Sequence, residues 1–289
     1  MKKTPFIFLL ATLSLVARVN VVVSVLPQAT FVKKIGGDHV RVITMVQPGQ
    51  SPHSYEPKPD QMRVLSHADV YFSIGVEFEK AWLDKFKAQN KTLVILDSSK
   101  GITRIKMSMH HHHNTTEHHA DAQHDPEQHG LDPHVWTTPA NVKMIARNIY
   151  HGLVKVDARH AAYYKQRYAA CVSEINRVDQ QIKATLKPLK KGAKFLVFHP
   201  SWGYFARAYN LTQIPVEAEG KNPKPKALIS IIKEAKKEHA KAIFVQPEFS
   251  DKSAKIIAQA LGIKVVKISP LNPHWSENLI NMAHAIAGK

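Results

Sequence analysis

The chain has 289 residues, which is enough for one large domain or for two lobes of ordinary size. Hydrophobic residues make up 44% and charged residues 22%, a balance that excludes an intrinsically disordered chain and is typical of a globular one with a sizeable core. The formal net charge is +17. Because the basic residues are spread along expected helices and form no nucleic-acid-binding module, we expect a solvated surface and no nucleic-acid partner.

The first residues read as an export signal. A positive start is followed by an uncharged apolar run over residues 5–17. That run is short for a membrane-spanning helix, which needs about 20 residues, and has the length of a signal-peptide core. We therefore expect residues 1–19 to be a signal peptide, with an approximate boundary, and the mature protein to be periplasmic. The alternative is a buried first strand.

Strand-like and helix-like segments then alternate along the chain. β-Branched or apolar runs predict strands at 21–26, 40–46, 70–74 and 92–96, and helices are expected at 28–35, 58–66 and 79–87. Such alternation predicts a parallel sheet with crossover helices.

A low-complexity insert interrupts this pattern at residues 107–133, and a helix at 141–154 follows it. A long polar helix comes next, from about residue 158 to 188, with no internal Gly or Pro before Pro188. The alternation restarts with strands at 195–198, 242–245 and 264–268 and helices at 202–209, 227–238, 252–261 and 276–287. Residues between 209 and 227, which include Pro215, Pro223 and Pro225, are expected to form a loop.

The predicted fold class is α/β, with two open parallel-sheet lobes joined by a long rigid helix. The expected divisions are an N-terminal lobe at 20–157, a linking helix at 158–188 and a C-terminal lobe at 189–289.

Three histidines stand outside the insert at positions suited to a ligand. His53 follows the strand at 40–46, and His199 ends the strand at 195–198. Ligands bind at the carboxyl ends of strands in open parallel sheets. His134 follows the insert, and each of the three lies beside a proline that restricts the backbone. Three neutral imidazoles can hold Zn²⁺ and leave a fourth position open.

The insert is rich in histidine and poor in apolar residues, so it cannot pack a core. Its histidines are His110, His111, His112, His113, His118, His119, His124 and His129. We expect a flexible loop that collects zinc weakly at several places.

Four segments resemble one known family: residues 47–57 (QPGQSPHSYEP), 132–136 (DPHVW), 198–205 (FHPSWGYF) and 245–250 (VQPEFS). In this order they are similar to the zinc-binding solute-binding proteins of bacterial metal ABC transporters, the ZnuA type of the cluster A-I family. The resemblance covers essentially the whole mature chain. It implies two α/β lobes bridged by a rigid helix, with metal in the cleft between them.

The resemblance also implies a site and a partner. His53, His134 and His199 match the family's metal ligands. The implied partner is an ABC permease in the inner membrane, with its cytoplasmic ATPase acting indirectly, and the protein itself is expected to be a monomer. It is expected to be a binding protein with no catalytic residues.

Two departures bear on the metal. Manganese-binding relatives typically have a glutamate where His199 stands and an aspartate where Ser250 stands. Imidazole suits zinc and carboxylate suits manganese, so Zn²⁺ is expected, with Mn²⁺ or Fe²⁺ as the alternative. The fourth ligand stays open between water, Glu56, Glu248 and a histidine of the insert, because Pro52 replaces the glutamate that some zinc members place beside the first histidine.

Three other functions are compatible with some of these features. A zinc hydrolase would need a general base beside the bound water, and Glu56, three residues after His53, is the carboxylate considered for that role. A periplasmic zinc buffer or chaperone, or an adhesin, would use the same fold. The insert suits a buffer, but a buffer would not require an ordered three-histidine site.

Overall fold

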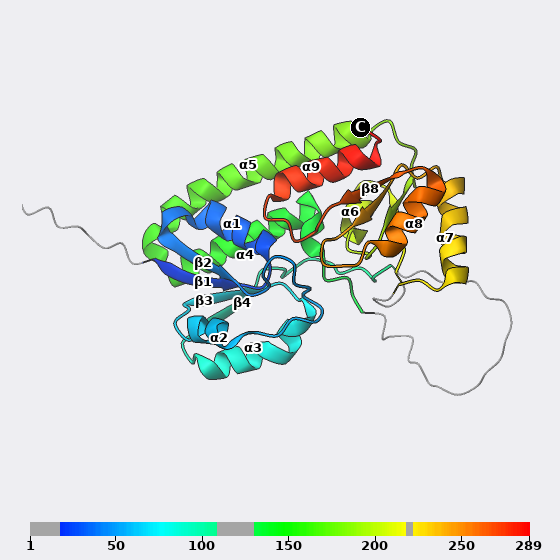
Figure 1. Cartoon of the computed structure of the whole chain (residues 1–289). Coiled ribbons are helices and arrows are strands. Elements are labelled where there is room, and N and C mark those ends of the chain that lie inside the picture. The colour runs from blue at the N-terminus through cyan, green and yellow to red at the C-terminus, as the bar shows by residue number, and fades with distance from the viewer. Residues whose placement is uncertain (1–17, 109–129, 218–221) are drawn as a thin grey trace, which may run out of the picture.

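The computed structural model describes residues 18–108, 130–217 and 222–289 (Figure 1). Residues 1–17 of the expected signal peptide and almost all of the histidine-rich insert lie outside these residues, whereas Val19, inside the expected signal peptide, already begins the first strand. Within the described part of the chain, no helix is long and apolar enough to cross a membrane.

The N-terminal half contains a four-stranded parallel sheet with the strand order β2-β1-β3-β4. Val21 in the centre pairs with Val42 on one side and Val70 on the other, and the strands of Val21 and Val70 are almost fully buried. Helices cover the sheet, as expected for crossover connections. The strands are β1 (Val19–Val23), β2 (Val40–Thr44), β3 (Val70–Ser73) and β4 (Val94–Asp97). The helices are α1 (Leu26–Gly36), α2 (Pro59–Leu65), α3 (Glu77–Gln89) and α4 (Pro139–Val156), with a 3₁₀ turn at Gly37–His39.

The C-terminal half contains a second parallel sheet with the strand order β6-β5-β7-β8. Its strands are β5 (Lys194–Val197), β6 (Thr212–Pro215), β7 (Ala242–Val245) and β8 (Lys264–Lys267). Its helices are α6 (Gly203–Ala208), α7 (Pro225–Lys237) and α8 (Lys252–Leu261). The two sheets confirm the predicted fold class.

The expectation of a loop around Pro215 was wrong at its start, because residues 212–215 form strand β6. This strand lies at the edge of its sheet and pairs only with β5, in a register that places Pro215 opposite Val197. A proline has no backbone N–H to donate to a neighbouring strand. It is therefore excluded from central strands but tolerated in an edge strand or at a strand end. The sequence-based prediction therefore missed this short strand, because it interpreted Pro215 as a sign of a loop.

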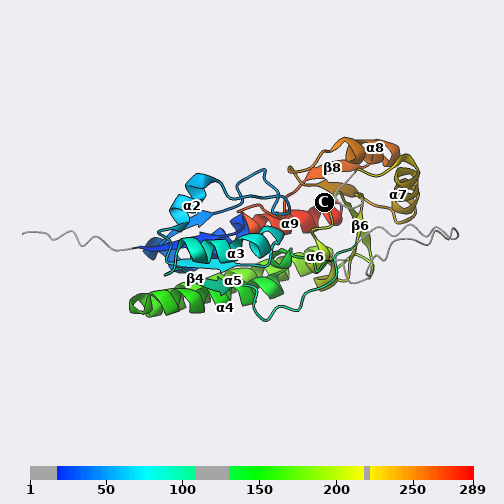
Figure 2. The same cartoon turned by 90° about the horizontal axis from the view of Figure 1, so that it is seen from below.

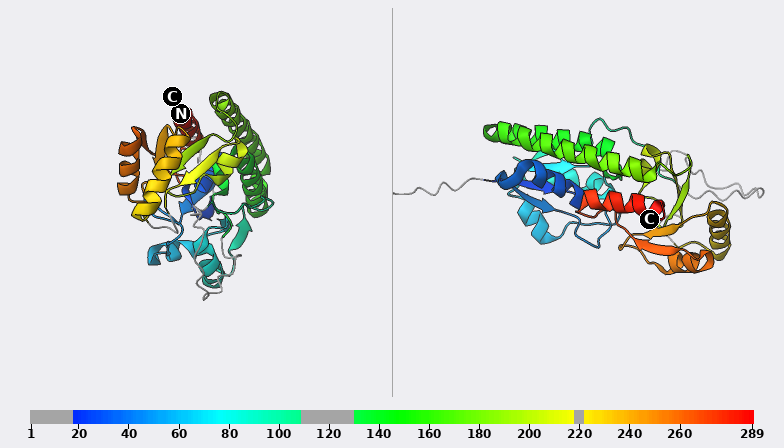
Figure 3. Two further views of the ribbon diagram at one scale, coloured as in Figure 1. Left: turned by 90° about the vertical axis from the view of Figure 1, so that its right-hand side faces the viewer. Right: turned by 90° about the horizontal axis from the view of Figure 1, so that it is seen from above.

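A long helix connects the two halves. The segment expected to be helical from residue 158 begins with a 3₁₀ turn at Ala158–His160 and continues as α5 (Ala161–Leu186), which runs along the molecule past both sheets (Figures 1 and 3). Cys171 is buried on this helix, as expected of a small core residue. The last helix, α9 (Trp275–Ile286), returns to pack against α5, where the Trp275 ring meets Phe31 of α1 edge-on.

These connections place the carboxyl ends of the two sheets toward each other. The view from below shows the two sheets toward opposite ends of the molecule (Figure 2). The segments that follow β2 and β5 meet between them, since Nε2 of His53 lies 3.1 Å from Nε2 of His199. The three histidines singled out above lie in this region.

Candidate functional site

His53 lies on the irregular segment between β2 and α2. Gln61 of α2 anchors this segment, since its side chain donates to the Met45 carbonyl at 2.7 Å and accepts from the Lys58 N–H at 3.1 Å. The imidazole Nδ1 of His53 lies 3.0 Å from Oε1 of Glu77, the first residue of α3. His53 therefore depends on Glu77 for its orientation.

His134 precedes a 3₁₀ turn at Val135–Thr137 and is almost fully buried. Asp132, two residues earlier, accepts two hydrogen bonds through Oδ1, from the His134 backbone N–H at 2.9 Å and from its Nδ1 at 2.8 Å. Pro133 between them restricts the backbone, so this short segment positions both groups.

His199 follows β5 and is buried. Its Nδ1 lies 2.6 Å from Oε1 of Glu217, which follows the neighbouring strand β6. Gln246, at the end of β7, donates to the His199 carbonyl at 2.9 Å, and the ring of Phe249 stacks on the imidazole at 4.9 Å between centroids. Residues from three adjacent strand ends thus hold this side chain.

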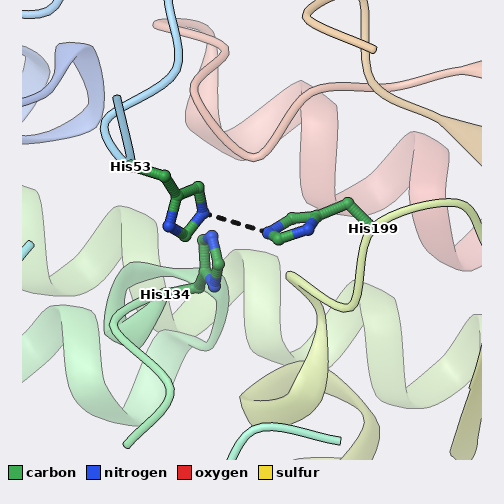
Figure 4. Close-up of side chains that lie close together, drawn as sticks. All are labelled: His53, His134 and His199. Carbon is green, nitrogen blue, oxygen red and sulfur yellow. Dashed lines mark hydrogen bonds between the residues drawn. The ribbon is translucent and has the colours of Figure 1, made fainter. Parts of the chain in front are cut away.

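The structure brings the three imidazoles together (Figure 4). Their ring centroids are 4.9 to 5.6 Å apart, and Nε2 of His53 lies 3.1 Å from Nε2 of His199. One potential ligand atom from each residue lies within 4.8 Å of the others. Two nitrogens bound to one tetrahedral zinc ion at about 2.0–2.1 Å would be roughly 3.3 Å apart, so this spacing suits zinc.

A carboxylate lies at Nδ1 of each of the three histidines. In each carboxylate the second oxygen is buried and has no hydrogen-bond partner among the described residues: Glu77 Oε2, Asp132 Oδ2 and Glu217 Oε2. A carboxylate at Nδ1 favours the tautomer that carries its proton there and directs the Nε2 lone pair to the centre. Three negative charges around neutral rings also favour a cation at that centre.

The surroundings shift the pKa values of two of the imidazoles in opposite directions. Burial lowers the pKa of His199 below its ordinary value, and the Glu217 hydrogen bond does not compensate fully. Burial also lowers the pKa of His53, but the hydrogen bond and charge of Glu77 outweigh it and raise the pKa overall. A low pKa keeps His199 neutral, which is the form that binds metal.

A family model described as "ZnuA: Zinc-uptake complex component A periplasmic" matches residues 21–287. The chain belongs to this family. Among curated relatives, it is 27% identical over 260 residues to the high-affinity zinc uptake system protein ZnuA of Bacillus subtilis, covering 88% of this chain and 79% of that protein. A solved structure described as the crystal structure of ZnuA superposes with a TM-score of 0.83 at 40% identity, covering 93% of this chain and 98% of the other.

Not every relative has the same length. The zinc-binding protein AdcA of Streptococcus pyogenes is 27% identical over 261 residues, which cover 88% of this chain and 50% of AdcA. AdcA is therefore about twice as long as the region that it shares with this chain.

Two carboxylates considered as a fourth ligand lie elsewhere. Glu56 is exposed, and Glu248 accepts a hydrogen bond from the Ser269 hydroxyl at 3.0 Å. Neither belongs to the group of gathered ligand atoms. The histidines of the insert lie outside the described residues, so water and those histidines remain as the other sequence-based candidates.

Sequence reasoning found the three histidines but missed the three carboxylates. Asp132 had a signal, since it lies two residues before an expected ligand. Glu217 follows the strand that was read as a loop, so its place beside the end of β5 was hidden. Glu77 lies 24 residues from His53 along the chain, and only the packing of α3 against the sheet brings the two together.

Proposed function

We propose that this chain binds one Zn²⁺ through Nε2 of His53, His134 and His199 and delivers it, outside the cytoplasm, to the permease of an ABC importer. The observation that supports this best is that the three imidazoles converge with Nε2 toward a common centre, while a carboxylate contacts Nδ1 of each ring. Orienting ligands before the metal arrives reduces the conformational entropy lost on binding. The family's printed description, a zinc-uptake component, agrees with this role.

The donor set favours zinc over manganese. Three imidazoles face the proposed metal position, and the nearby carboxylates bind the histidines, so the site offers nitrogen where manganese prefers oxygen. Three protein ligands leave a fourth tetrahedral position, which we assign to water. An open position of this kind suits a metal that must be passed on.

The same carboxylates weigh against a hydrolase. A general base must reach the metal-bound water, whereas Glu77, Asp132 and Glu217 all bind histidine on the side away from the metal. The ordered cluster also weighs against a buffer that uses only the insert, since weak binding at many histidines requires no fixed geometry.

The test is a competitive zinc titration of the metal-free mature protein against a chelator of known affinity. We expect one tight site in the full chain and in a variant that lacks residues 110–129. The triple variant His53→Ala, His134→Ala, His199→Ala should lose it.

A matched control is His274→Ala, because His274 is an exposed histidine at the start of α9. It should bind zinc like the unchanged protein. Tight binding that disappears with residues 110–129 and survives the triple substitution would refute the proposed site and favour a zinc buffer.

A further inference from the structure

A second surface with distinct chemistry lies on the outer side of the C-terminal sheet. The connections β6–α7–β7 and β7–α8–β8 cross the sheet in the same direction, so right-handed crossovers place both helices on one face. The helices pack against each other at the end of the molecule away from the N-terminal sheet (Figures 1 and 3). Their outer sides therefore form one continuous surface.

Lysines dominate this surface. The inner sides of the helices bury small and apolar residues such as Ala227, Ile231 and Ile257. The exposed residues recur at helical spacing on the opposite sides. We define the basic face as the exposed lysines of the two helices, Lys226, Lys233, Lys236, Lys237, Lys252 and Lys255.

Acidic residues do little to neutralise the basic face. Glu234 is the only acidic residue of α7, and α8 has none. Glu234 and Glu238, which follows α7 by one residue, both bind Lys194, at 3.1 and 3.3 Å. Asp251, before α8, pairs with Lys255 at 3.1 Å. The face keeps a strong excess of positive charge.

Each helix also exposes one isoleucine among these lysines. Ile229 is 56% exposed and Ile256 is 52% exposed, which is unusual for such large apolar side chains in the described part of the chain. Ile229 lies three residues after Lys226 and four before Lys233, and Ile256 lies four residues after Lys252, so each shares a helix face with lysine. Lysines around a protruding apolar side chain suit the interface of a bilayer, where ammonium groups meet phosphates and apolar side chains enter the headgroup layer.

We propose that the basic face binds the surface of a membrane that contains anionic phospholipids. A lysine near such a surface strengthens binding about fivefold, so several acting together give reversible, salt-sensitive attachment. The lysines are distributed along two neighbouring helices, at residues 226–237 and 252–255, which fits an extended layer of phosphates better than a single small anion. The three-histidine cluster contains none of these residues, so the proposal does not depend on zinc binding.

Co-sedimentation of the mature chain with vesicles tests this proposal. One set of vesicles contains one-third phosphatidylglycerol in phosphatidylcholine, and the other contains phosphatidylcholine alone, each at low and at high salt. We expect binding to the anionic vesicles at low salt, and at least about a tenfold weaker affinity at high salt. Equal binding to both kinds of vesicle, or to neither, would overturn the proposal.

Charge reversal separates the basic face from net charge. The variant Lys226→Glu, Lys233→Glu, Lys236→Glu should lose affinity for anionic vesicles by at least about tenfold. The control Lys165→Glu, Lys187→Glu, Lys190→Glu changes the net charge equally, at exposed lysines of α5 and the segment after it, and should lose much less. Equal losses in the two variants would show that only net charge matters.

Two further measurements complete the test. Ile229→Ser, Ile256→Ser should reduce the binding that persists at high salt, because the substitutions remove the apolar contribution. Zinc titration of every variant checks folding and should match the unchanged protein. Binding to a polyglutamate chain as tight as to anionic vesicles, with the same dependence on the three lysines, would instead assign the face to an acidic protein.

Discussion

The three-histidine cluster has a buried side and an exposed side. The pair His134–Asp132 has side chains 5% and 0% exposed, and the pair His199–Glu217 has 8% and 6%. The pair His53–Glu77 has 29% and 41%. Two of the proposed ligands thus lie in the protein interior, and the third lies on an irregular segment at the surface.

This difference indicates how a receptor can bind metal tightly and still release it. Buried imidazoles held by buried carboxylates have little freedom to reorient, so they define the position of the metal. His53 can move away at smaller cost, because its partner Glu77 is partly solvated and screened. We infer that His53 joins the metal last and leaves it first, and the predictions below run from the largest effect on zinc binding to the smallest.

Removal of a ligand should have the largest effect. His134→Ala and His199→Ala should each weaken zinc binding by more than about a hundredfold, beyond the range expected for losing an outer partner. His53→Ala should weaken it less than either. Chelator competition measures all three, and a His53→Ala defect larger than both others would reverse the assignment of the two sides.

The carboxylates should follow the same order with smaller losses. Asp132→Asn and Glu217→Gln should each weaken zinc binding by about 10- to 100-fold, because an amide holds the imidazole without the favourable charge. Glu77→Gln should cost less than about tenfold and act mainly by speeding zinc dissociation. Stopped-flow transfer of zinc to a chelator resolves the rates.

The exposed residue Glu277 offers a control for these changes, as Glu277→Gln should leave both affinity and rate unchanged. If Glu77→Gln and Asp132→Asn had equal effects on affinity and dissociation, exposure would not explain the behaviour of the site.

Gly203 lies close to Asp132, so its substitution tests the packing around the buried His134–Asp132 pair. A Cβ added at Gly203 would lie 2.6 Å from Asp132 Oδ2, so Gly203→Ala must displace that carboxylate or the start of α6. We expect a loss of about 1–3 kcal/mol in the free energy of unfolding and weaker zinc binding than in the unchanged protein. Urea unfolding and zinc titration measure the two effects.

The matched substitution is Gly130→Ala, since a Cβ there meets nothing within 4 Å and no unusual backbone angle is involved. It should be close to neutral. Equal effects of the two substitutions would mean that the contact with Asp132 is unimportant.

Glu79 stabilises the backbone just before α3, the helix that begins with Glu77. Of the residues that support the site, it should affect zinc binding least. Its buried carboxylate accepts the N–H groups of Ile74 and Gly75, just before α3 begins at Glu77, and burial raises its pKa to about 7. The folded state therefore holds a proton that the unfolded state releases at lower pH. Stability should fall as pH rises from the ordinary glutamate range to about 7, and the full cost should persist above that pH.

Glu79→Gln mimics the protonated group and should remove this contribution, which is on the order of 3 kcal/mol. Urea unfolding of the zinc-free protein at about pH 5 and about pH 8 should show a smaller stability difference in the variant than in the unchanged protein. An identical difference in both would show that Glu79 does not titrate in this range.

Local patterns in the sequence were enough to predict the fold class and to single out the three histidines. β-Branched and apolar runs depend only on neighbours along the chain, so seven of the eight strands in the described part of the chain could be placed. The strand-end positions of His53 and His199 followed from them. Strand β6 was missed because a proline is compatible with a strand only at the edge of a sheet or at a strand end. The local sequence does not show which strand will lie at the edge.

Which carboxylate binds which histidine depends on the packing of elements that are distant along the chain. Asp132 and His134 are two residues apart, but Glu217 meets His199 across the neighbouring ends of β5 and β6, and Glu77 meets His53 from the start of α3. The difference in exposure between the two buried histidine–carboxylate pairs and the His53–Glu77 pair also arises from tertiary packing. Burial and hydrogen bonding depend on how separate elements pack, whereas strand and helix patterns depend on neighbours along the chain.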